Sequence, residues 1–300
     1  MAENGQSLEE TILAYLPRTL VRLKETGQLT LDRPEETTFE GAVLFCDLAG
    51  FTRLTERLSA TRPEGVEAVV AVLNRYFSAI IDTIHRRGGD VLHFAGDALT
   101  AIWPGHGDDL SEALQRAASC ALAIQHDIPP VTVEEGVTLA SKISLSTGSI
   151  RLSQLGGLFG RWLPLSTGSW LASLEDAARQ AGPGAVVLAR PAVEHLVGWA
   201  ETSELEAGCH RLNQLINKSV ADIEGLKDEA REPSSGLLPL LPGAVQARLA
   251  AGQGTWLAEM RTVTILFVKL ASLTDGAPLG EAHDLVARLQ EVVYGHEGSI

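Results

Sequence analysis

The sequence predicts an α+β protein with the ferredoxin-like order β, α, β, β, α, β, in which helices pack on one face of a sheet. Three observations favour this fold. Short apolar runs bounded by glycine suit buried strands, and longer segments between them carry apolar residues at helical spacing. The chain of 300 residues is 45% hydrophobic and 21% charged, which is typical of a soluble globular protein with one large or two medium domains.

The first half of this order ends near residue 103. The run "GAVLFCDL" (41–48) is short, apolar and bounded by glycine, which is typical of a buried strand. A helical region is predicted over about 51–87, because its apolar residues form a core-facing stripe and it ends in two basic residues and two glycines. Residues 90–103, "DVLHFAGDALTAIW", predict two short strands around a tight Ala-Gly-Asp turn.

The second half continues the alternation of helix and strand. A helix over about 109–127 precedes the strand-like stretch 138–152, and a helical stretch at 169–181 precedes the apolar run 184–190. Residues 1–35 are expected to form an amphipathic N-terminal helix and a lead-in, because the apolar run at the N-terminus is interrupted every third or fourth position. Acids stand where a signal peptide would carry positive charge, so no signal peptide is expected. The first domain is expected to span residues 36–212.

The later part of the chain predicts a linker and an incomplete second copy of the first domain. The polar, breaker-rich stretch "KDEAREPSSG" places an inter-domain linker at 213–259. In the remaining residues, 260–300, "VTILFVKLASL" repeats the pattern of "AVLFCDLAGF", and the closing "YGHEGSI" echoes "IHRRGGDV". We therefore expect the first strand and the first helix of a second domain.

Charge and cysteine content exclude some functions. A formal net charge of -14 argues against a nucleic-acid surface, but a triphosphate stays compatible because Mg²⁺ on carboxylates often binds it. Cys46, Cys120 and Cys209 have neither metal-ligand spacing nor a disulfide pattern, so we expect reduced thiols in a cytoplasmic protein. No apolar run reaches the roughly 18–20 residues that cross a bilayer, so no membrane span is expected.

Two aspartates are the candidate metal-binding residues. Asp47 ends an apolar run, and Asp97 follows the glycine of the predicted hairpin turn. If neighbouring strands bring both acids to one end of the sheet, they predict a Mg²⁺ site. After Asp47, "LAGFT" (48–52) would present backbone N–H groups to phosphate oxygens at a helix N-terminus. Taken singly, Asp97 is typical of a turn residue, and Asp47 of an N-cap or edge-strand acid.

The stretches "LFCDLAGFT" and "GGDVLHFAGDALTAIW" together resemble the class III nucleotidyl cyclases. The layout most resembles the soluble adenylyl cyclases and their tandem-domain bacterial relatives, with "RTVTILFVKL" opening the second catalytic domain. The resemblance implies an adenylate cyclase that makes 3′,5′-cyclic AMP and pyrophosphate from ATP in cytoplasmic signalling. It also implies two Mg²⁺ or Mn²⁺ ions, one lowering the pKa of the ribose 3′-hydroxyl and the other neutralising the pyrophosphate.

The resemblance assigns roles to residues of the first domain. Asp47 and Asp97 become catalytic metal ligands, and the backbone carbonyl of Leu48 becomes a further ligand. The residues expected to hold the phosphates are Ala49, Gly50, Phe51, Thr52 and Lys142. From the residues alone, Lys142 is equally typical of a solvent-facing strand lysine.

Several positions depart from the family pattern. Where the family has an Asn and, four residues later, an Arg that stabilise transition-state charge, this chain has Ala172 and Asp176. Where the first copy has Asp47, the second has Lys269. The resemblance therefore implies that a second cyclase domain, in the same chain or in another copy, completes the active site. It also implies that residues 1–300 alone are inactive or weakly active.

The same alignment with the family places His93 and Glu175 in a degenerate regulatory site, which binds bicarbonate in the soluble adenylyl cyclases. Because a glutamate repels a small anion, these residues do not favour bicarbonate activation. His93 is interpreted as a pH-sensitive element or a plain strand histidine. Two other functions stay open: a non-catalytic nucleotide-binding or sensor module, and a guanylate cyclase.

Overall fold

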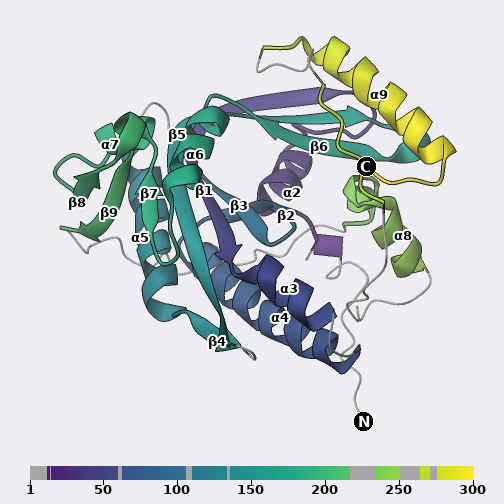
Figure 1. Ribbon diagram of the computed structural model, residues 1–300. Helices are drawn as coiled ribbons and strands as arrows, with labels where there is room; N and C mark the ends of the chain where they lie inside the picture. Colours follow the sequence, from purple (N-terminus) through teal and green to yellow (C-terminus); the bar gives the residue numbers. More distant parts are fainter. Residues whose placement is uncertain are drawn as a thin grey trace. The chain divides into compact units, whose positions relative to one another are not determined.

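The computed structural model describes residues 12–13, 15–59, 63–105, 110–133, 136–216, 234–250, 264–270 and 276–300. The chain divides into two compact units. The larger unit contains the described parts of Phe39–Ile150 and Gly168–Lys227, and the smaller unit contains those of Met1–Thr38, Arg151–Thr167 and Asp228–Ile300. Figure 1 shows the elements of both units as labelled ribbons.

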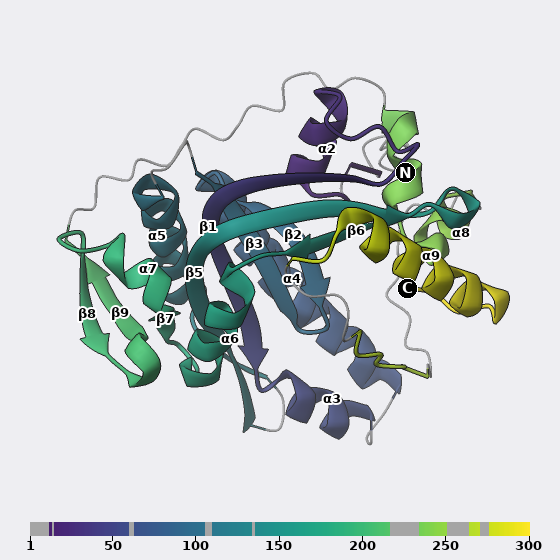
Figure 2. The ribbon, with the colours of Figure 1, turned by 90° about the horizontal axis from the view of Figure 1, so that it is seen from above.

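A mixed sheet forms the centre of the larger unit. Seven strands follow one another in the order β2 (Asp90–Ala95), β3 (Ala98–Pro104), β1 (Glu35–Ala49), β5 (Val137–Gly156), β7 (Val186–Leu188), β9 (His210–Leu215) and β8 (Ala200–Glu204). The short β4 (Val131–Val133) pairs with β5. The long strands β1 and β5 are neighbours in the middle of the sheet (Figure 2). The predicted first strand and hairpin therefore lie side by side.

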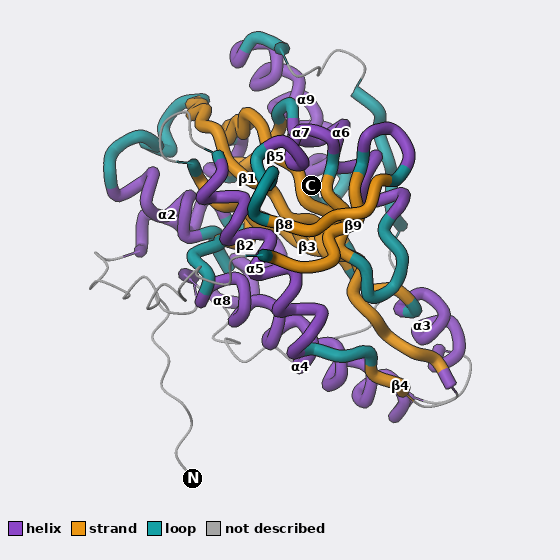
Figure 3. The backbone as a smooth tube through the Cα atoms, turned by 90° about the vertical axis from the view of Figure 1, so that its left-hand side faces the viewer, coloured by secondary structure: helices purple, strands orange, loops and turns teal. Residues whose placement is uncertain are grey.

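Two helices cover one face of this sheet (Figure 3). They are α4 (Pro63–Arg86) and α5 (Ser111–Asp127). From α4, Tyr76, Ile80 and Ile84 enter the main core at the spacing of one helix face, and α5 presents a buried face rich in alanine. The strands and these two helices give the predicted order β, α, β, β, α, β, so the α+β fold class is confirmed.

The predicted helical region at 51–87 is divided into α3 (Phe51–Ser59) and α4. Residues 60–62 lie outside the described residues. The second helix begins at Pro63, and proline favours the first turn of a helix because it lacks the N–H that has no acceptor there.

A further helix, α6 (Trp170–Gln180), lies on the opposite face of the sheet. Adjacent strand residues point to opposite faces. Val186 belongs to the core with α5, whereas Val187 packs against Ala177 of α6. The short helix α7 (Arg190–Glu194) and the 3-10 turn η3 (Glu206–Gly208) complete the larger unit.

The smaller unit contains the hairpin of β5 with β6 (Trp162–Thr167) and the 3-10 turn η2 (Leu158–Gly160) between them. Helix α9 (Leu279–Gly295) packs on this hairpin. The buried side chain of Gln290 accepts a hydrogen bond from the Leu158 N–H at 3.1 Å and donates one to the Arg161 carbonyl at 2.9 Å. Polar contacts as well as apolar ones therefore fix α9 on the hairpin.

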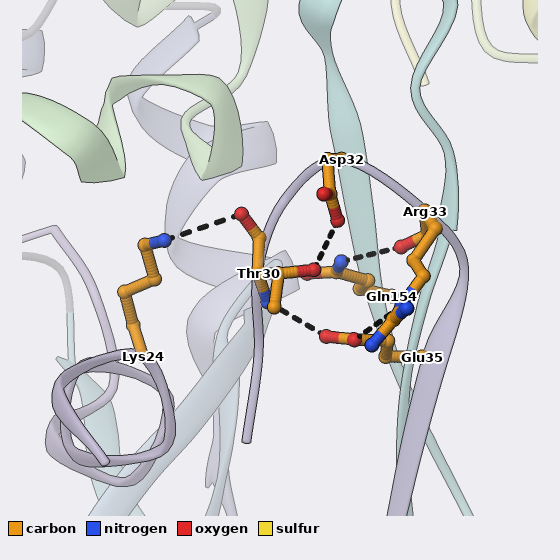
Figure 4. Close-up of polar contacts among 6 residues, drawn as sticks. All are labelled: Lys24, Thr30, Asp32, Arg33, Glu35 and Gln154. Carbon is orange, nitrogen blue, oxygen red and sulfur yellow. Dashed lines mark hydrogen bonds and ion pairs between the residues drawn. The ribbon is translucent and has the colours of Figure 1, made fainter. Parts of the chain in front are cut away.

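A second cluster of the smaller unit contains α2 (Arg18–Glu25), the 3-10 helix η4 (Ser234–Leu240) and α8 (Gly243–Ala250). After α2, hydrogen bonds fix the turn that leads into β1 (Figure 4). The Thr30 N–H donates to Glu35 Oε2 at 2.6 Å, and Gln154 Nε2 donates to the Arg33 carbonyl at 2.7 Å. Residues 1–11 of the predicted N-terminal helix lie outside the described residues.

The predicted second copy is not confirmed. A helix, α9, lies within residues 260–300, but residues 264–270, "TILFVKL", form no strand. Ile265, Leu266 and Phe267 are 68%, 78% and 90% exposed. A strand needs a neighbour to satisfy its backbone N–H and C=O groups, and this segment has none among the described residues. The linker at 213–259 and the second domain at 260–300 stay predictions.

The three cysteines are unpaired thiols in the structure. Cys46, Cys120 and Cys209 are free and buried, and burial raises the pKa of Cys46 and raises that of Cys120 to about 12. Such thiols are poor nucleophiles, because the thiolate is the reactive form.

Among the described residues, no helix combines the length and the apolar character that a membrane span requires.

Candidate active site

The alternation of residues along β1 and β5 sets the position of the candidate site. Cys46 points into the core with α4 and α5, so its neighbour Asp47 projects from the opposite face of the sheet. On β5, Ile143 points into the same core, so Lys142 and Ser144 project to the face that carries Asp47. The apolar run before Asp47 is therefore the buried strand, and the acid lies on its other face.

Asp97 lies beside Asp47 at one end of the sheet. Asp47 is opposite Ala98 in the pairing of β1 with β3, and the Leu48 N–H donates to the Asp97 carbonyl at 3.2 Å. Both aspartate side chains are partly exposed. The structure thus places Asp97, in the turn between β2 and β3, next to the residue that pairs with Asp47 of β1.

The turn after Asp47 leads directly into α3. Gly50 has a φ of +90°, and a Cβ atom there would lie 2.4 Å from the Thr138 carbonyl oxygen, so the position requires glycine. The N–H groups in the first turn of a helix have no acceptor within the helix and attract anions. The predicted phosphate-binding segment, residues 49–52, therefore lies at a helix N-terminus next to Asp47.

An ion pair joins Lys142 of β5 to Asp47 of β1. The two side chains are 29% and 25% exposed, respectively. Lys142 is therefore directed at the candidate metal ligand. This position favours a role in the site over that of a solvent-facing strand lysine.

A cavity of about 220 Å³ adjoins this ion pair. Residues of β1 and β5 line it together with Glu175 and Arg179 of α6. Ser144 lines it as well, and its buried hydroxyl has no hydrogen-bond partner among the described residues. A buried hydroxyl normally has a partner, so this one is available to a bound group.

Helix α6 presents both positively and negatively charged side chains beside the cavity. Arg179 pairs with Glu175 at 3.0 Å and also with Asp176. The predicted repulsion of a small anion by Glu175 is therefore offset by the guanidinium of Arg179. Ala172 is exposed on the same helix and offers no side-chain polar group.

His93 is not among the residues that line this cavity. It lies on β2 beside an irregularity in the pairing with β3, and its side chain is exposed. Desolvation by surrounding protein atoms lowers its pKa. Of the two predicted regulatory residues, only Glu175 reaches the cavity that contains Asp47.

The two aspartates suit a magnesium site that is completed by substrate. In the part of the chain that the structure describes, no group of three or more His, Cys, Asp and Glu side chains is placed to hold a metal ion. Mg²⁺ is commonly bound through one or two carboxylates, with water and substrate phosphates as the other ligands. The side chains of Asp47 and Asp97 are the carboxylates that fit this pattern, and the ligand role of the Leu48 carbonyl stays a prediction.

Sequence reasoning did not single out Ser144 and Arg179. Ser144 is two residues from Lys142, so the alternation of a strand places both on one face. Arg179 is four residues after Glu175, which is the spacing of an ion pair on a helix. Both signals were present in the sequence, but they became specific only once the faces of the sheet were assigned.

The chain is similar in sequence to adenylate cyclases. It is 34% identical over 158 residues to adenylate cyclase type 10 of Rattus norvegicus, a match that covers 52% of this chain and 10% of that protein. It is 26% identical over 202 residues to photoactivated adenylate cyclase subunit alpha of Euglena gracilis, covering 65% of this chain and 18% of that protein. The matches thus span only a small part of the length of these relatives. No protein-family model matches the chain.

Solved cyclase structures share the fold of the chain. The adenylyl cyclase CyaB from P. aeruginosa gives a TM-score of 0.50 at 17% identity, covering 63% of this chain and 99% of that one. A bacterial light-regulated adenylyl cyclase gives 0.52 at 21% identity, covering 68% of this chain and 59% of that one. A guanylyl cyclase domain from Blastocladiella emersonii gives 0.50 at 19% identity, covering 61% and 99%. The chain therefore has the catalytic-domain fold of the class III nucleotidyl cyclases, and its sequence is similar to those of adenylate cyclases.

Proposed function

We propose that the chain is the metal-binding part of an adenylate cyclase, which converts ATP into 3′,5′-cyclic AMP and pyrophosphate with two Mg²⁺ or Mn²⁺ ions. The observation that carries this proposal is the position of Asp47 at the end of β1 and of Asp97 in the adjoining β2–β3 turn, beside the Gly50 turn at the start of α3. The relatives named adenylate cyclases favour ATP over GTP as the substrate.

Each group of the site has a task in this reaction. Bound at Asp47, Asp97 and the Leu48 carbonyl, the ions would lower the pKa of the ribose 3′-hydroxyl and balance the charge of the pyrophosphate. The amides of residues 49–52 bind triphosphate oxygens and hold the α-phosphorus near the 3′-oxygen. A bond forms between these two atoms, the bond from the α-phosphorus to the departing pyrophosphate oxygen breaks, and the hydroxyl proton passes to solvent.

Lys142 connects the metal ligands with the phosphates in this proposal. Its ammonium group pairs with Asp47 in the structure. When ATP binds, the same group reaches the terminal phosphate oxygens, which leaves Asp47 as a metal ligand. The hydroxyl of Ser144, without a partner among the described residues, lies on the same face and is a further donor for the bound complex.

A second cyclase domain is part of the proposal. Ala172 and Asp176 provide neither an amide nor a guanidinium where the family stabilises transition-state charge. We infer that a second domain, in the same chain or in another copy, supplies these groups. The chain by itself is then expected to bind metal and triphosphate but to produce little cyclic nucleotide.

A non-catalytic nucleotide-binding module is the alternative that Ala172 and Asp176 favour. Such a module would keep the metal ligands and the amides of residues 49–52, and it would use nucleotide binding as a signal. Such a module would bind nucleotide but would produce no cyclic nucleotide, either alone or together with a second domain.

Metal binding tests the proposed site most directly. In the variants Asp47→Asn and Asp97→Asn, we expect the Mn²⁺ affinity to fall by about tenfold or more, because each variant loses a charged ligand. The affinity is measured by isothermal titration calorimetry with a non-hydrolysable ATP analogue present. Asp82→Asn, an exposed position on α4, is the matched control and is expected to keep the affinity.

Turnover then separates the cyclase from the alternatives. Cyclic AMP and cyclic GMP are measured by mass spectrometry after incubation with ATP or GTP, for the chain alone and for a protein extended to a complete second domain. We expect cyclic AMP from the extended protein and little or none from residues 1–300. Metal binding without any cyclic nucleotide would support the sensor module, cyclic GMP alone would support a guanylate cyclase, and unchanged Mn²⁺ affinity in both variants would refute the metal site.

A further inference from the structure

Helix α9 lies along the β5–β6 hairpin of the smaller unit (Figure 2). Ala282 and Val286 of α9 are buried with Leu155 of β5. Gly156, the next residue of β5, allows a close approach of the helix, because a Cβ atom there would collide with the side chain of Gln290. Few apolar side chains form this contact, so its polar groups contribute to how firmly α9 is held.

His283 of α9 accepts a hydrogen bond from the backbone of the hairpin. Gly156 is buried, and its N–H donates to His283 Nδ1 at 3.2 Å. The next N–H of the strand, that of Gly157, donates to the Arg161 carbonyl at 2.9 Å within the hairpin. Successive residues of an antiparallel strand direct their N–H groups to opposite sides. The Gly156 N–H is therefore directed away from β6, and His283 is its acceptor.

This hydrogen bond requires the neutral form of His283. A ring nitrogen accepts a hydrogen bond only when it carries no proton, and both nitrogens of a charged imidazole are donors. Protonation would place two N–H groups against each other and leave the buried Gly156 N–H without an acceptor, which is costly. Histidine ordinarily changes its charge between about pH 5 and 8. The contact of α9 with the hairpin therefore depends on a group that titrates near neutral pH.

Trp162 of β6 stacks on the ring of His283. The two ring centroids are 6.2 Å apart, and the ring planes are inclined by 25°. This stacking holds the imidazole beside the hairpin. A charged imidazole is attracted to the face of an indole, but that attraction supplies no acceptor for the Gly156 N–H. We therefore expect protonation to weaken the contact.

The charged groups near His283 do not provide a counter-ion for its protonated form. On the hairpin, Arg151 pairs with Glu36 of β1 at 3.6 Å, and the Arg161 guanidinium lies 4.9 Å from the centre of the Tyr294 ring. Neither arginine would stabilise a second positive charge. The charged side chains of α9 are exposed, and among the described residues none of them pairs with His283: Glu281, Asp284, Arg288 and Glu291. Solvent and salt screen the attraction of exposed carboxylates.

We propose that His283 is a pH-sensitive latch, which holds α9 on the β5–β6 hairpin when it is neutral and weakens this contact when it is protonated. Release of α9 exposes the buried apolar residues Leu155, Ala282 and Val286. The hairpin belongs to the predicted first domain and α9 to the predicted second, so the latch makes the attachment of these two segments depend on pH. All of the groups lie in the smaller unit, and the proposal does not depend on the cyclase reaction.

Hydrogen exchange followed by mass spectrometry tests the latch in the chain of 300 residues at pH 7.5 and pH 5.5. The protection of each peptide is corrected for the intrinsic exchange rate at that pH. Peptides from α5, in the larger unit, serve as the internal reference. We expect the protection of α9 relative to α5 to fall by about tenfold or more at pH 5.5, because the buried N–H of Gly156 loses its acceptor.

His283→Asn is the decisive variant, because the amide oxygen of asparagine accepts a hydrogen bond and does not titrate. Its relative protection of α9 is expected to be the same at both pH values. His283→Leu has no acceptor, so α9 is expected to be weakly protected at both. His296→Asn, at an exposed histidine after α9, is the matched control and is expected to keep the full decrease.

Three results would overturn the latch. The first is a relative protection of α9 that does not fall at pH 5.5 in the unmodified protein. The second is the same decrease in His283→Asn as in the unmodified protein. The third is a protection of α9 in His283→Leu at pH 7.5 that equals that of the unmodified protein, since the hydrogen bond to Gly156 would then contribute nothing.

Discussion

Strand β1 and residues 264–270 have the same sequence pattern but different environments. Residues 42–48 read "AVLFCDL" and residues 264–270 read "TILFVKL". Val43 and Leu44 of β1 are fully buried, whereas Ile265 and Leu266 are 68% and 78% exposed. β1 lies between β3 and β5, and the later segment has no neighbouring strand among the described residues. An apolar run therefore specifies a strand only when partner strands satisfy its backbone.

The polar position within the repeated pattern also differs. Asp47 projects toward Lys142, while the corresponding residue of the later segment is Lys269, which is exposed. A lysine does not replace a carboxylate as a ligand for Mg²⁺. Residues 42–48 therefore contain a candidate metal ligand that residues 264–270 lack, and the second copy and its complementary role stay predictions.

The largest expected effect tests the difference in burial. Leu44→Ala is expected to lower the free energy of unfolding by about 2–5 kcal/mol, because it removes a fully buried side chain from the main core. Leu266→Ala, at the corresponding position of the later segment, is expected to change it by less than about 0.5 kcal/mol. Urea denaturation followed by circular dichroism measures both. Equal effects of the two substitutions would show that the later segment is packed.

The fold was largely predictable from sequence because it depends on local patterns. The glycine-bounded run at 41–48 and the Ala-Gly-Asp turn predict β1 and the hairpin that pairs with it, and both lie where expected. The strand predicted at 264–270 is absent because partners, which the pattern does not encode, decide whether a strand forms.

The candidate site was predictable only in part. Asp47 stands out because an acid is costly at the end of an apolar run, and Asp97 because it follows the glycine of the predicted hairpin turn. Their neighbours Ser144 and Arg179 depend on tertiary packing, since α6 reaches the cavity from a distant part of the sequence. The offset of the Glu175 charge by Arg179 likewise required the geometry of the helix.

A smaller effect is expected at the turn after β1. Gly50→Ala is expected to lower the free energy of unfolding by about 1–3 kcal/mol, because the φ of +90° and the contact of 2.4 Å with the Thr138 carbonyl oppose a side chain. Gly276→Ala, before α9, is the matched control because its added Cβ meets no atom within 4 Å. Urea denaturation measures both variants. A loss of Mn²⁺ affinity in Gly50→Ala would also connect the turn with the metal site, while an equal cost at both glycines would contradict the steric argument.

The ion pair between β1 and β5 is expected to contribute still less to stability. Lys142→Met is expected to change the free energy of unfolding by less than about 1 kcal/mol, because the pair with Asp47 is partly exposed and screened by solvent. A double-mutant cycle with Asp47→Asn isolates the coupling between the two residues. Without ATP, the Mn²⁺ affinity of Lys142→Met is expected to rise, because the lysine no longer competes for Asp47. A coupling free energy well above about 1 kcal/mol would show that the ion pair stabilises the association of β1 with β5.

The smallest expected effect concerns His93, on the hairpin that supplies β1 with its partner strand. Desolvation lowers the folded-state pKa of His93 below its ordinary value of about 6.5. The unfolded chain therefore binds more protons as the pH falls, so this residue stabilises the fold above about pH 6.5 and the contribution is lost as the pH falls through the folded-state pKa. The difference in unfolding free energy between pH 7.5 and pH 5 is expected to be smaller in His93→Gln than in the unmodified protein.

His296→Gln, at an exposed histidine after α9, is the control and is expected to leave this difference unchanged. If His93→Gln left it unchanged as well, His93 would be a plain strand histidine, and the acid sensitivity of the fold would reside in other groups.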